Sequence, residues 1–189
     1  LGRYTRYITC KGQDLDPSSY TALGVERAIK VAARCILKRQ SLEGVSILIQ
    51  GLGKVGFALA NLLAQQGARL IVCDINKALV DKVGAALDVQ VIEPEALACS
   101  HADIFVPCAF GTLVDHQCLE QLSAGIIISA SNNPLAAGLD AQSIWQQYAK
   151  YYIPDYLVNG GGLVHCVAQY FSYSKNYIET KIKRVDLLV

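Results

Sequence analysis

The 189-residue chain has 52% hydrophobic and 17% charged residues and a formal net charge of +1, so it is long and apolar enough to bury one sizeable core. Its Lys and Arg residues are scattered, which excludes a basic nucleic-acid-binding surface, and no apolar run reaches the about 18 residues of a membrane span. Seven cysteines without a CxxC pair argue against disulfides and zinc. We therefore expect a cytoplasmic protein with no metal, nucleic-acid or membrane partner.

The N-terminal residues 1–17 contain turn-forming residues without a regular apolar period, and they predict a linker. From Ser18 onward, apolar residues recur at helical spacing until 41–44, where the pattern breaks. Residues 18–189 are therefore predicted to form one domain. The chain begins with Leu1 and contains no methionine, so we expect it to be a fragment or an excised domain of a longer protein.

Short runs rich in Val, Ile and Leu then alternate with helical segments. The predicted strands are 45–50, 69–75, 89–92, 102–108, 125–130 and 151–158. Nearly continuous apolar strands are typical of a parallel sheet whose two faces are both covered by helices. The alternation predicts an α/β fold with a doubly wound, mostly parallel sheet of the Rossmann type. Residues 94–99 are among the predicted helical segments, and the stretch after Gly162 predicts one or two closing helices.

A G-x-G-x-x-G motif at Gly51, Gly53 and Gly56 follows the first predicted strand and opens a predicted helix. In such a motif the first glycine permits the sharp turn, the second lets backbone amides approach a pyrophosphate, and the third lets helix and strand pack closely. The helix N-terminus adds free N–H groups and a partial positive charge. A tight loop without a ligand uses the same residues, but the strand–turn–helix context favours dinucleotide binding.

Asp74 ends the next predicted strand, 18 residues after Gly56, close to the spacing of the acidic residue that binds the adenosine ribose. Its carboxylate can accept hydrogen bonds from both ribose hydroxyls and would repel a 2′-phosphate. The sequence therefore favours NAD over NADP, although Arg69 and Lys77 lie nearby and leave NADP open. The alternative role of Asp74 is to cap the following helix together with Asn76.

Small and amide side chains follow the last three predicted strands, where ligands bind in doubly wound sheets. The four segments LEGVSILIQGLGKVG, ADIFVPCAFG, SASNNPL and PDYLVNGGG occur in this order. Taken singly, the Asn-Asn-Pro and Gly-Gly-Gly segments are also typical of plain turns and loops. As an ordered set, the four resemble the Glu/Leu/Phe/Val dehydrogenase family, especially its leucine and phenylalanine dehydrogenase branch. The resemblance runs from about Tyr20 to the end of the chain and implies the C-terminal coenzyme domain of that family.

The resemblance implies roles for individual residues. Its cofactor-binding positions are Thr21, Gly51, Leu52, Gly53, Lys54, Val55, Gly56, Asp74, Ile75, Cys108, Ala109, Asn133 and Asn159. Lys54 stands where the family commonly has asparagine, and Gly160 replaces an alanine. The substrate pocket is implied to include Asn133, Leu163 and Cys166.

The activity that the resemblance implies is the NAD-dependent oxidative deamination of an L-amino acid by an even-numbered homo-oligomer. Leu163 and Cys166 favour an apolar substrate such as leucine. In the family, a catalytic lysine and aspartate come from a separate N-terminal domain. Apart from Lys54, no lysine here lies in a glycine-rich, apolar setting, so we expect no catalytic residue in this chain and no turnover by the chain alone.

The alternative is a non-catalytic NAD-binding regulatory module that lacks the lysine-bearing domain. His165, which stands where the family usually has asparagine, is the sole histidine near the predicted site. A hydroxyacid dehydrogenase would need it as a catalyst with a carboxylate partner. A polar residue near a helix start is the simpler reading of His165, and we rank the hydroxyacid dehydrogenase last.

Overall fold

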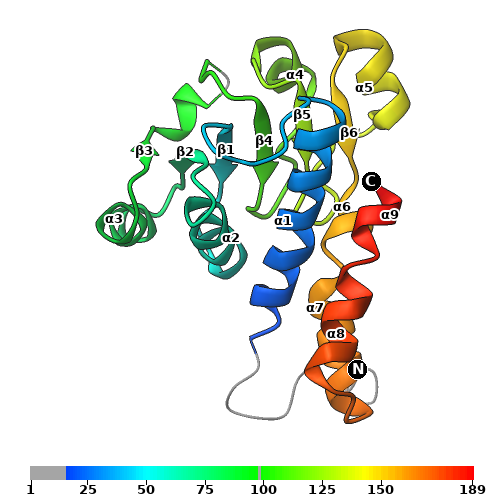
Figure 1. Ribbon diagram of the computed structural model, residues 1–189. Helices are drawn as coiled ribbons and strands as arrows, with labels where there is room; N and C mark the ends of the chain where they lie inside the picture. Colours follow the sequence, from blue (N-terminus) through cyan, green and yellow to red (C-terminus); the bar gives the residue numbers. More distant parts are fainter. Residues whose placement is uncertain (1–15, 98) are drawn as a thin grey trace.

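The computed structural model describes residues 16–97 and 99–189, so most of the predicted linker, residues 1–15, lies outside the described part (Figure 1). The strands form one sheet in the order β3-β2-β1-β4-β5-β6, and every neighbouring pair is parallel. The strands are β1 (Ser46–Gln50), β2 (Arg69–Cys73), β3 (Gln90–Val91), β4 (Ile104–Pro107), β5 (Ile126–Ile128) and β6 (Tyr151–Ile153). The predicted doubly wound parallel fold is confirmed.

Helices cover both faces of the sheet. They are α1 (Ser18–Cys35), α2 (Lys54–Ala64), α3 (Lys77–Ala86), α4 (His116–Gln121), α5 (Ala141–Tyr148), α6 (Asp155–Val158), α7 (Gly161–Tyr170), α8 (Lys175–Ile182) and α9 (Val185–Leu188). Ile47 and Ile49 of β1 pack into the core beneath α1 and α2, while Leu48 faces the core beneath α4 and α5. Because successive strand residues point to opposite faces, this alternation requires a helical layer on each side.

Helix α1 lies alongside α2 on one side and the C-terminal helices α7 to α9 on the other (Figure 1). Its apolar stripe, which includes Val25 and Ile29, is fully buried. Gly24 is required where α1 meets the end of α6, because an added Cβ would overlap the carbonyl oxygen of Val158. Within residues 16–97 and 99–189, no helix combines the length and the apolar character that a bilayer crossing demands.

Three predicted segments differ from the structure. The strand predicted over 151–158 ends at Ile153, because Pro154 cannot donate to the ladder and instead starts α6. In the segment predicted to be helical at 94–99, the described residues form a single 3-10 turn, Pro94–Ala96. The C-terminal stretch forms three helices rather than one or two; Ser174 separates α7 from α8 by accepting a hydrogen bond from the N–H of Tyr177.

The order of the strands fixes where a ligand crevice lies. After β3 the chain crosses the sheet and returns as β4 beside β1, so the loops that follow β1 and β4 leave toward opposite faces. In doubly wound sheets the crevice opens at the carboxyl ends of these two strands. The glycine motif follows β1 and Cys108 follows β4, which places both predicted motifs at this switch point.

Candidate functional site: the turn after strand β1

The glycine turn is closed by contacts that exclude side chains. Gly51 has φ +95°, and an added Cβ would lie 2.6 Å from the backbone nitrogen of Ala109 after β4. A Cβ on Gly56 would overlap the carbonyl oxygen of Gly51, so the first turn of α2 lies directly on the loop. Gly53 differs, because within residues 16–97 and 99–189 no other atom lies within 4 Å of its missing side chain. Gly51 and Gly56 therefore allow the close contacts that form the turn, whereas Gly53 leaves open space beside the start of α2.

Helix α2 begins beside this space with Gly53 as its N-cap, and no side chain caps it. The first N–H groups of an α-helix have no partner within the helix, and they carry the positive end of the helix dipole. An eleven-residue helix with an uncapped N-terminus and open space in front of it can accept an anion. This cradle fits the diphosphate of a dinucleotide.

The carboxylate of Asp74 lies at the next strand end and is half-buried. Its Oδ2 accepts a hydrogen bond from the N–H of Leu52 at 2.6 Å, and its Oδ1 accepts one from the N–H of Asn76 at 2.7 Å. Asn76, rather than Asp74, is the N-cap of α3, where its side chain accepts from the N–H of Ala78. Asp74 is thus fixed beside the glycine turn, with the side chain of Ile75 almost fully exposed next to it.

The loop after β4 forms the other wall. The N–H of Cys108 donates to the carbonyl oxygen of Gln50 at 2.7 Å, and Ala109 contacts Gly51 as described. Burial raises the pKa of the Cys108 thiol to about 12, so this cysteine is a neutral spacer at ordinary pH and not a nucleophile. Phe110, to which the sequence analysis gave no role, is 99% exposed at the same edge.

The predicted nicotinamide end comprises Asn133, Asn159 and Thr21. The amide of Asn159 donates to Asn132 Oδ1 at 2.7 Å and to the carbonyl oxygen of Ala130 at 3.3 Å, so the loops after β5 and α6 are joined. Asn133 adopts φ +51°, which asparagine tolerates better than most residues. At the carboxyl edge of the sheet the structure therefore joins Asn159 to Asn132, which directly precedes the predicted Asn133.

Thr21 lies in the first turns of α1, where its hydroxyl donates to the carbonyl oxygen of Pro17 at 3.3 Å. A Cβ on Gly162 would lie 2.6 Å from the Thr21 Oγ1, so the start of α7 packs directly on this turn. One turn along α7, Leu163 is 63% exposed, whereas Cys166 is buried. The two residues implied to shape the substrate pocket therefore differ in exposure, and only Leu163 has an open side chain.

Two side chains that sequence reasoning left without a role also lie at this edge. Asp16 forms an ion pair with Lys54 at 3.4 Å, which joins the start of α1 to the glycine turn. Both residues line a hollow of about 450 Å³ above the start of α2. Tyr20 stacks on His165 of α7, with ring centroids 4.3 Å apart. Both contacts join residues far apart in the chain, so no local pattern could have signalled them.

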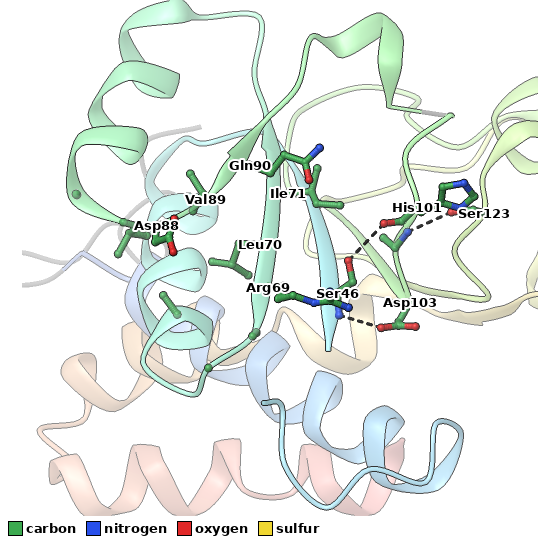
Figure 2. A pocket seen from close by; sticks show the side chains of 16 residues that line it. Ser46, Arg69, Leu70, Ile71, Asp88, Val89, Gln90, His101, Asp103 and Ser123 are labelled. Atoms are coloured by element: carbon green, nitrogen blue, oxygen red, sulfur yellow. Dashed lines mark hydrogen bonds between the residues drawn. The ribbon is translucent and has the colours of Figure 1, made fainter. Parts of the chain in front are cut away.

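A larger hollow, about 1010 Å³, lies elsewhere, at the amino ends of the strands (Figure 2). Several of its polar groups are already bonded within the protein: Asp103 accepts from the N–H of Ser46 at 2.8 Å, and the hydroxyl of Ser123 donates to the carbonyl oxygen of Ser100 at 2.7 Å. Figure 2 shows these side chains along the rim of the hollow. Because those groups are already satisfied, size alone does not make this hollow a dinucleotide site.

One lysine outside any glycine-rich segment is nevertheless buried. Lys150 is buried, and its Nζ donates to the carbonyl oxygens of Leu122 and Ala124 at 2.6 and 3.0 Å. Burial lowers its pKa. Lys150 precedes β6 and thus lies at the amino edge of the sheet, away from the glycine turn, so its role there is structural. In the described part of the chain, no group of three or more His, Cys, Asp or Glu residues has the arrangement of a metal site.

Comparison with known proteins gives consistent matches. The sequence model of the Glutamate/Leucine/Phenylalanine/Valine dehydrogenase family matches residues 12–94 and 85–185. Leucine dehydrogenase of Bacillus subtilis (strain 168) is 34% identical over 186 residues, which are 96% of this chain and 50% of that protein. Phenylalanine dehydrogenase of Bacillus thermotolerans is 34% identical over 178 residues, 90% of this chain and 46% of that protein.

A solved structure agrees with these sequences. The crystal structure of L-tryptophan dehydrogenase from Nostoc punctiforme superposes with a TM-score of 0.85 at 29% identity, covering 92% of this chain and 53% of that one. The chain thus spans about half the length of the curated relatives it matches.

Proposed function

The chain belongs to the Glutamate/Leucine/Phenylalanine/Valine dehydrogenase family, and from that premise we propose that it is the coenzyme-binding domain of an NAD-dependent L-amino acid dehydrogenase. In the proposed reaction, a hydride leaves the α-carbon of the amino acid for the nicotinamide of NAD, and the resulting imine is hydrolysed to a 2-oxo acid and ammonia. The observation that supports this best is the uncapped start of α2 facing open space at Gly53, with the Asp74 carboxylate beside it.

This chain's own residues bind and orient the coenzyme in the proposal. The amides at the start of α2 hold the diphosphate, and the Asp74 carboxylate accepts hydrogen bonds from the adenosine ribose. Asn133, Asn159 and Thr21 orient the nicotinamide end. When bound, NAD supplies the hydride acceptor.

NAD is preferred to NADP in this proposal because of charge. The Asp74 carboxylate is held beside the turn by two backbone N–H groups, so it cannot easily move away from a 2′-phosphate. Asp81, Glu93 and Glu95 line the same hollow as Asp74 and outnumber its cationic residue, Lys77, so the charge at the end of β2 is negative on balance.

The proposed substrate is an apolar L-amino acid, with leucine as the first to test. Relatives with about one third identity are named leucine and phenylalanine dehydrogenases. The exposed side chain of Leu163 supplies an apolar surface at the start of α7, near Thr21 and Asn159. We further propose an even-numbered homo-oligomer, which sedimentation equilibrium would test.

The experiment is a calorimetric titration of the chain with NAD and with NADP. We expect NAD to bind more tightly, and Asp74→Ala to weaken NAD by about tenfold, or 1.4 kcal/mol, through loss of the ribose hydrogen bonds. Asp88→Ala is the matched control, because Asp88 is an exposed carboxylate on the amino-edge hollow. Equal NAD affinity in the two variants would refute the proposed site.

A dehydrogenase assay with leucine tests whether this chain only binds the coenzyme while catalytic residues come from another domain. We expect no turnover by this chain alone, because the buried lysine, Lys150, lies at the wrong edge of the sheet to act as the general base. If a longer protein that includes this chain oxidises leucine, the proposed dehydrogenase is supported. If that longer protein binds NAD but does not oxidise leucine, the alternative of a regulatory module is supported.

A further inference from the structure

The contact between α1 and α7 is built around an unusual histidine. His165 is 1% exposed, and among the residues that the structure describes neither of its ring nitrogens has a hydrogen-bond partner. Its ring lies nearly parallel to that of Tyr20, with an interplanar angle of 15°. Buried imidazoles normally find a partner, because an unpaired polar group in an apolar setting is costly. Hydrogen bonding therefore does not explain why a histidine is buried at this position, which points to its ring stacking instead.

Close backbone contacts surround this stacked pair. A Cβ on Gly161 would overlap the carbonyl oxygen of Tyr20, and a Cβ on Gly162 would crowd Thr21 Oγ1. The first turns of α1 and α7 are thus in direct contact, and the Tyr20–His165 stack lies one turn further along α7. Thr21 follows Tyr20 directly, and Asn159 comes just before α7, so a shift of this junction would move both residues.

We propose that His165 is a positioning residue: its neutral imidazole, stacked on Tyr20, holds α1 against α7 and so fixes Thr21 and Asn159 where the nicotinamide of NAD binds. The inference rests on the proposed function and extends it to a residue outside the binding groove. A protonated His165 would place an uncompensated charge in this junction and loosen it.

Most of the described charged groups on the elements packed against α7 already have other partners, which leaves them less free to pair with a protonated His165. On and around α1 and α8 they are engaged in other pairs: Asp16 with Lys54, Glu26 with Lys30, Arg27 with Asp186, Lys175 with Glu179, and Lys181 with the ring of Tyr177. Burial lowers the pKa of His165 from its ordinary value of 6.5. The folded state therefore binds fewer protons than the unfolded state, and stability falls as the pH drops below about 6.5.

Three proteins test the role: the wild-type chain, His165→Phe and His165→Leu. Phenylalanine keeps the aromatic stack but cannot be protonated, whereas leucine keeps the apolar volume without the stack. Calorimetry with NAD at pH 7.5 and 5.5 should show the wild-type Kd rising at the lower pH, by less than the about tenfold that a histidine with the ordinary pKa of 6.5 would give, because burial lowers the pKa of His165. We expect His165→Phe to bind like wild type at pH 7.5 and to lose this dependence. His165→Leu should bind several-fold more weakly at both pH values.

A second ligand separates positioning from folding. ADP-ribose carries the adenosine and diphosphate but no nicotinamide, so its Kd should be equal in all three proteins at pH 7.5. His101→Phe is the matched control, because His101 is exposed at the amino edge and should leave the pH dependence of NAD binding unchanged. Thermal unfolding of each variant establishes that it is folded at the temperature of titration.

The outcomes distinguish the two claims. If His165→Phe retains the wild-type pH dependence, or if folded His165→Leu binds NAD as wild type does, the positioning role is wrong while the proposed function stands. If His165→Leu weakens ADP-ribose as much as NAD, the residue supports the whole fold and the positioning role is also wrong. If wild type binds neither ligand, the proposed function and this inference both fail.

Discussion

The amino and carboxyl edges of the sheet differ in whether their hydrogen-bonding groups are available to a ligand, and the size of the hollow at each edge does not show this difference. The amino edge has the larger hollow, yet its polar groups, such as Asp103 and the Ser123 hydroxyl, bond to other groups of the protein. The hollows at the carboxyl edge, of about 450 and 690 Å³, are smaller, but there α2 begins uncapped in front of open space. A ligand site is marked by hydrogen-bonding groups that the fold leaves available, and the edges can be tested against each other on that basis.

The largest effect should come from filling the glycine turn. A methyl group in Gly56→Ala would overlap the carbonyl oxygen of Gly51, so the helix must move away from the loop. We expect the free energy of unfolding to fall by about 3 kcal/mol and NAD binding to be lost. Urea unfolding and calorimetry measure the two effects.

The control for this substitution is at the other edge. Gly125 precedes β5, and no atom lies within 4 Å of its missing side chain. Gly125→Ala should change the free energy of unfolding by less than about 0.5 kcal/mol and leave NAD binding intact. Comparable damage from both substitutions would contradict the distinction between the edges.

A smaller effect is expected from Lys150 at the amino edge. Lys150→Met leaves the carbonyl oxygens of Leu122 and Ala124 without their buried donor, which should cost about 2 kcal/mol of stability. NAD affinity should not change, because this residue is far from the glycine turn in the fold. Lys183→Met, at an exposed position, is the control for losing a lysine. A weaker NAD Kd for Lys150→Met would show that the amino edge contributes to binding.

The smallest effect concerns the ion pair between Asp16 and Lys54. Asp16→Asn keeps an oxygen for the N–H of Ser18 but releases the Lys54 ammonium to interact with the diphosphate. NAD affinity should rise about two- to threefold at low salt, the size expected for an exposed ion pair, and the gain should vanish at about 1 M salt. Glu179→Gln, which breaks the exposed pair with Lys175, is the control. A gain that persists at high salt would exclude this electrostatic explanation.

Local patterns predicted the parts of the molecule that local forces determine. Continuous apolar strands indicated a sheet covered on both faces, and the spacing of Gly51, Gly53 and Gly56 located the turn between β1 and α2. The error at 151–158 arose because the apolar run continues past Pro154, where the chain leaves the sheet for α6. Apolar periodicity alone does not distinguish a strand from a short helix.

Contacts between distant segments were beyond sequence reasoning. The stack of Tyr20 on His165 and the burial of Lys150 depend on which helices and loops meet after folding. His165 was interpreted as a polar residue near a helix start, whereas the structure buries it completely. The predicted coenzyme contacts of Asp74, Asn133 and Asn159 stay predictions until a titration tests them.

The glycine contacts that α1 makes with the end of α6 and the start of α7 also bear on how the chain folds. Gly24 meets Val158, and Gly161 meets Tyr20, so each contact closes a loop that contains most of the sheet. Such closure is slow, because much chain entropy is lost before the contact forms. We expect the strands to assemble first and this junction to form late, so ribosomal synthesis must deliver nearly the whole domain before the coenzyme groove is complete.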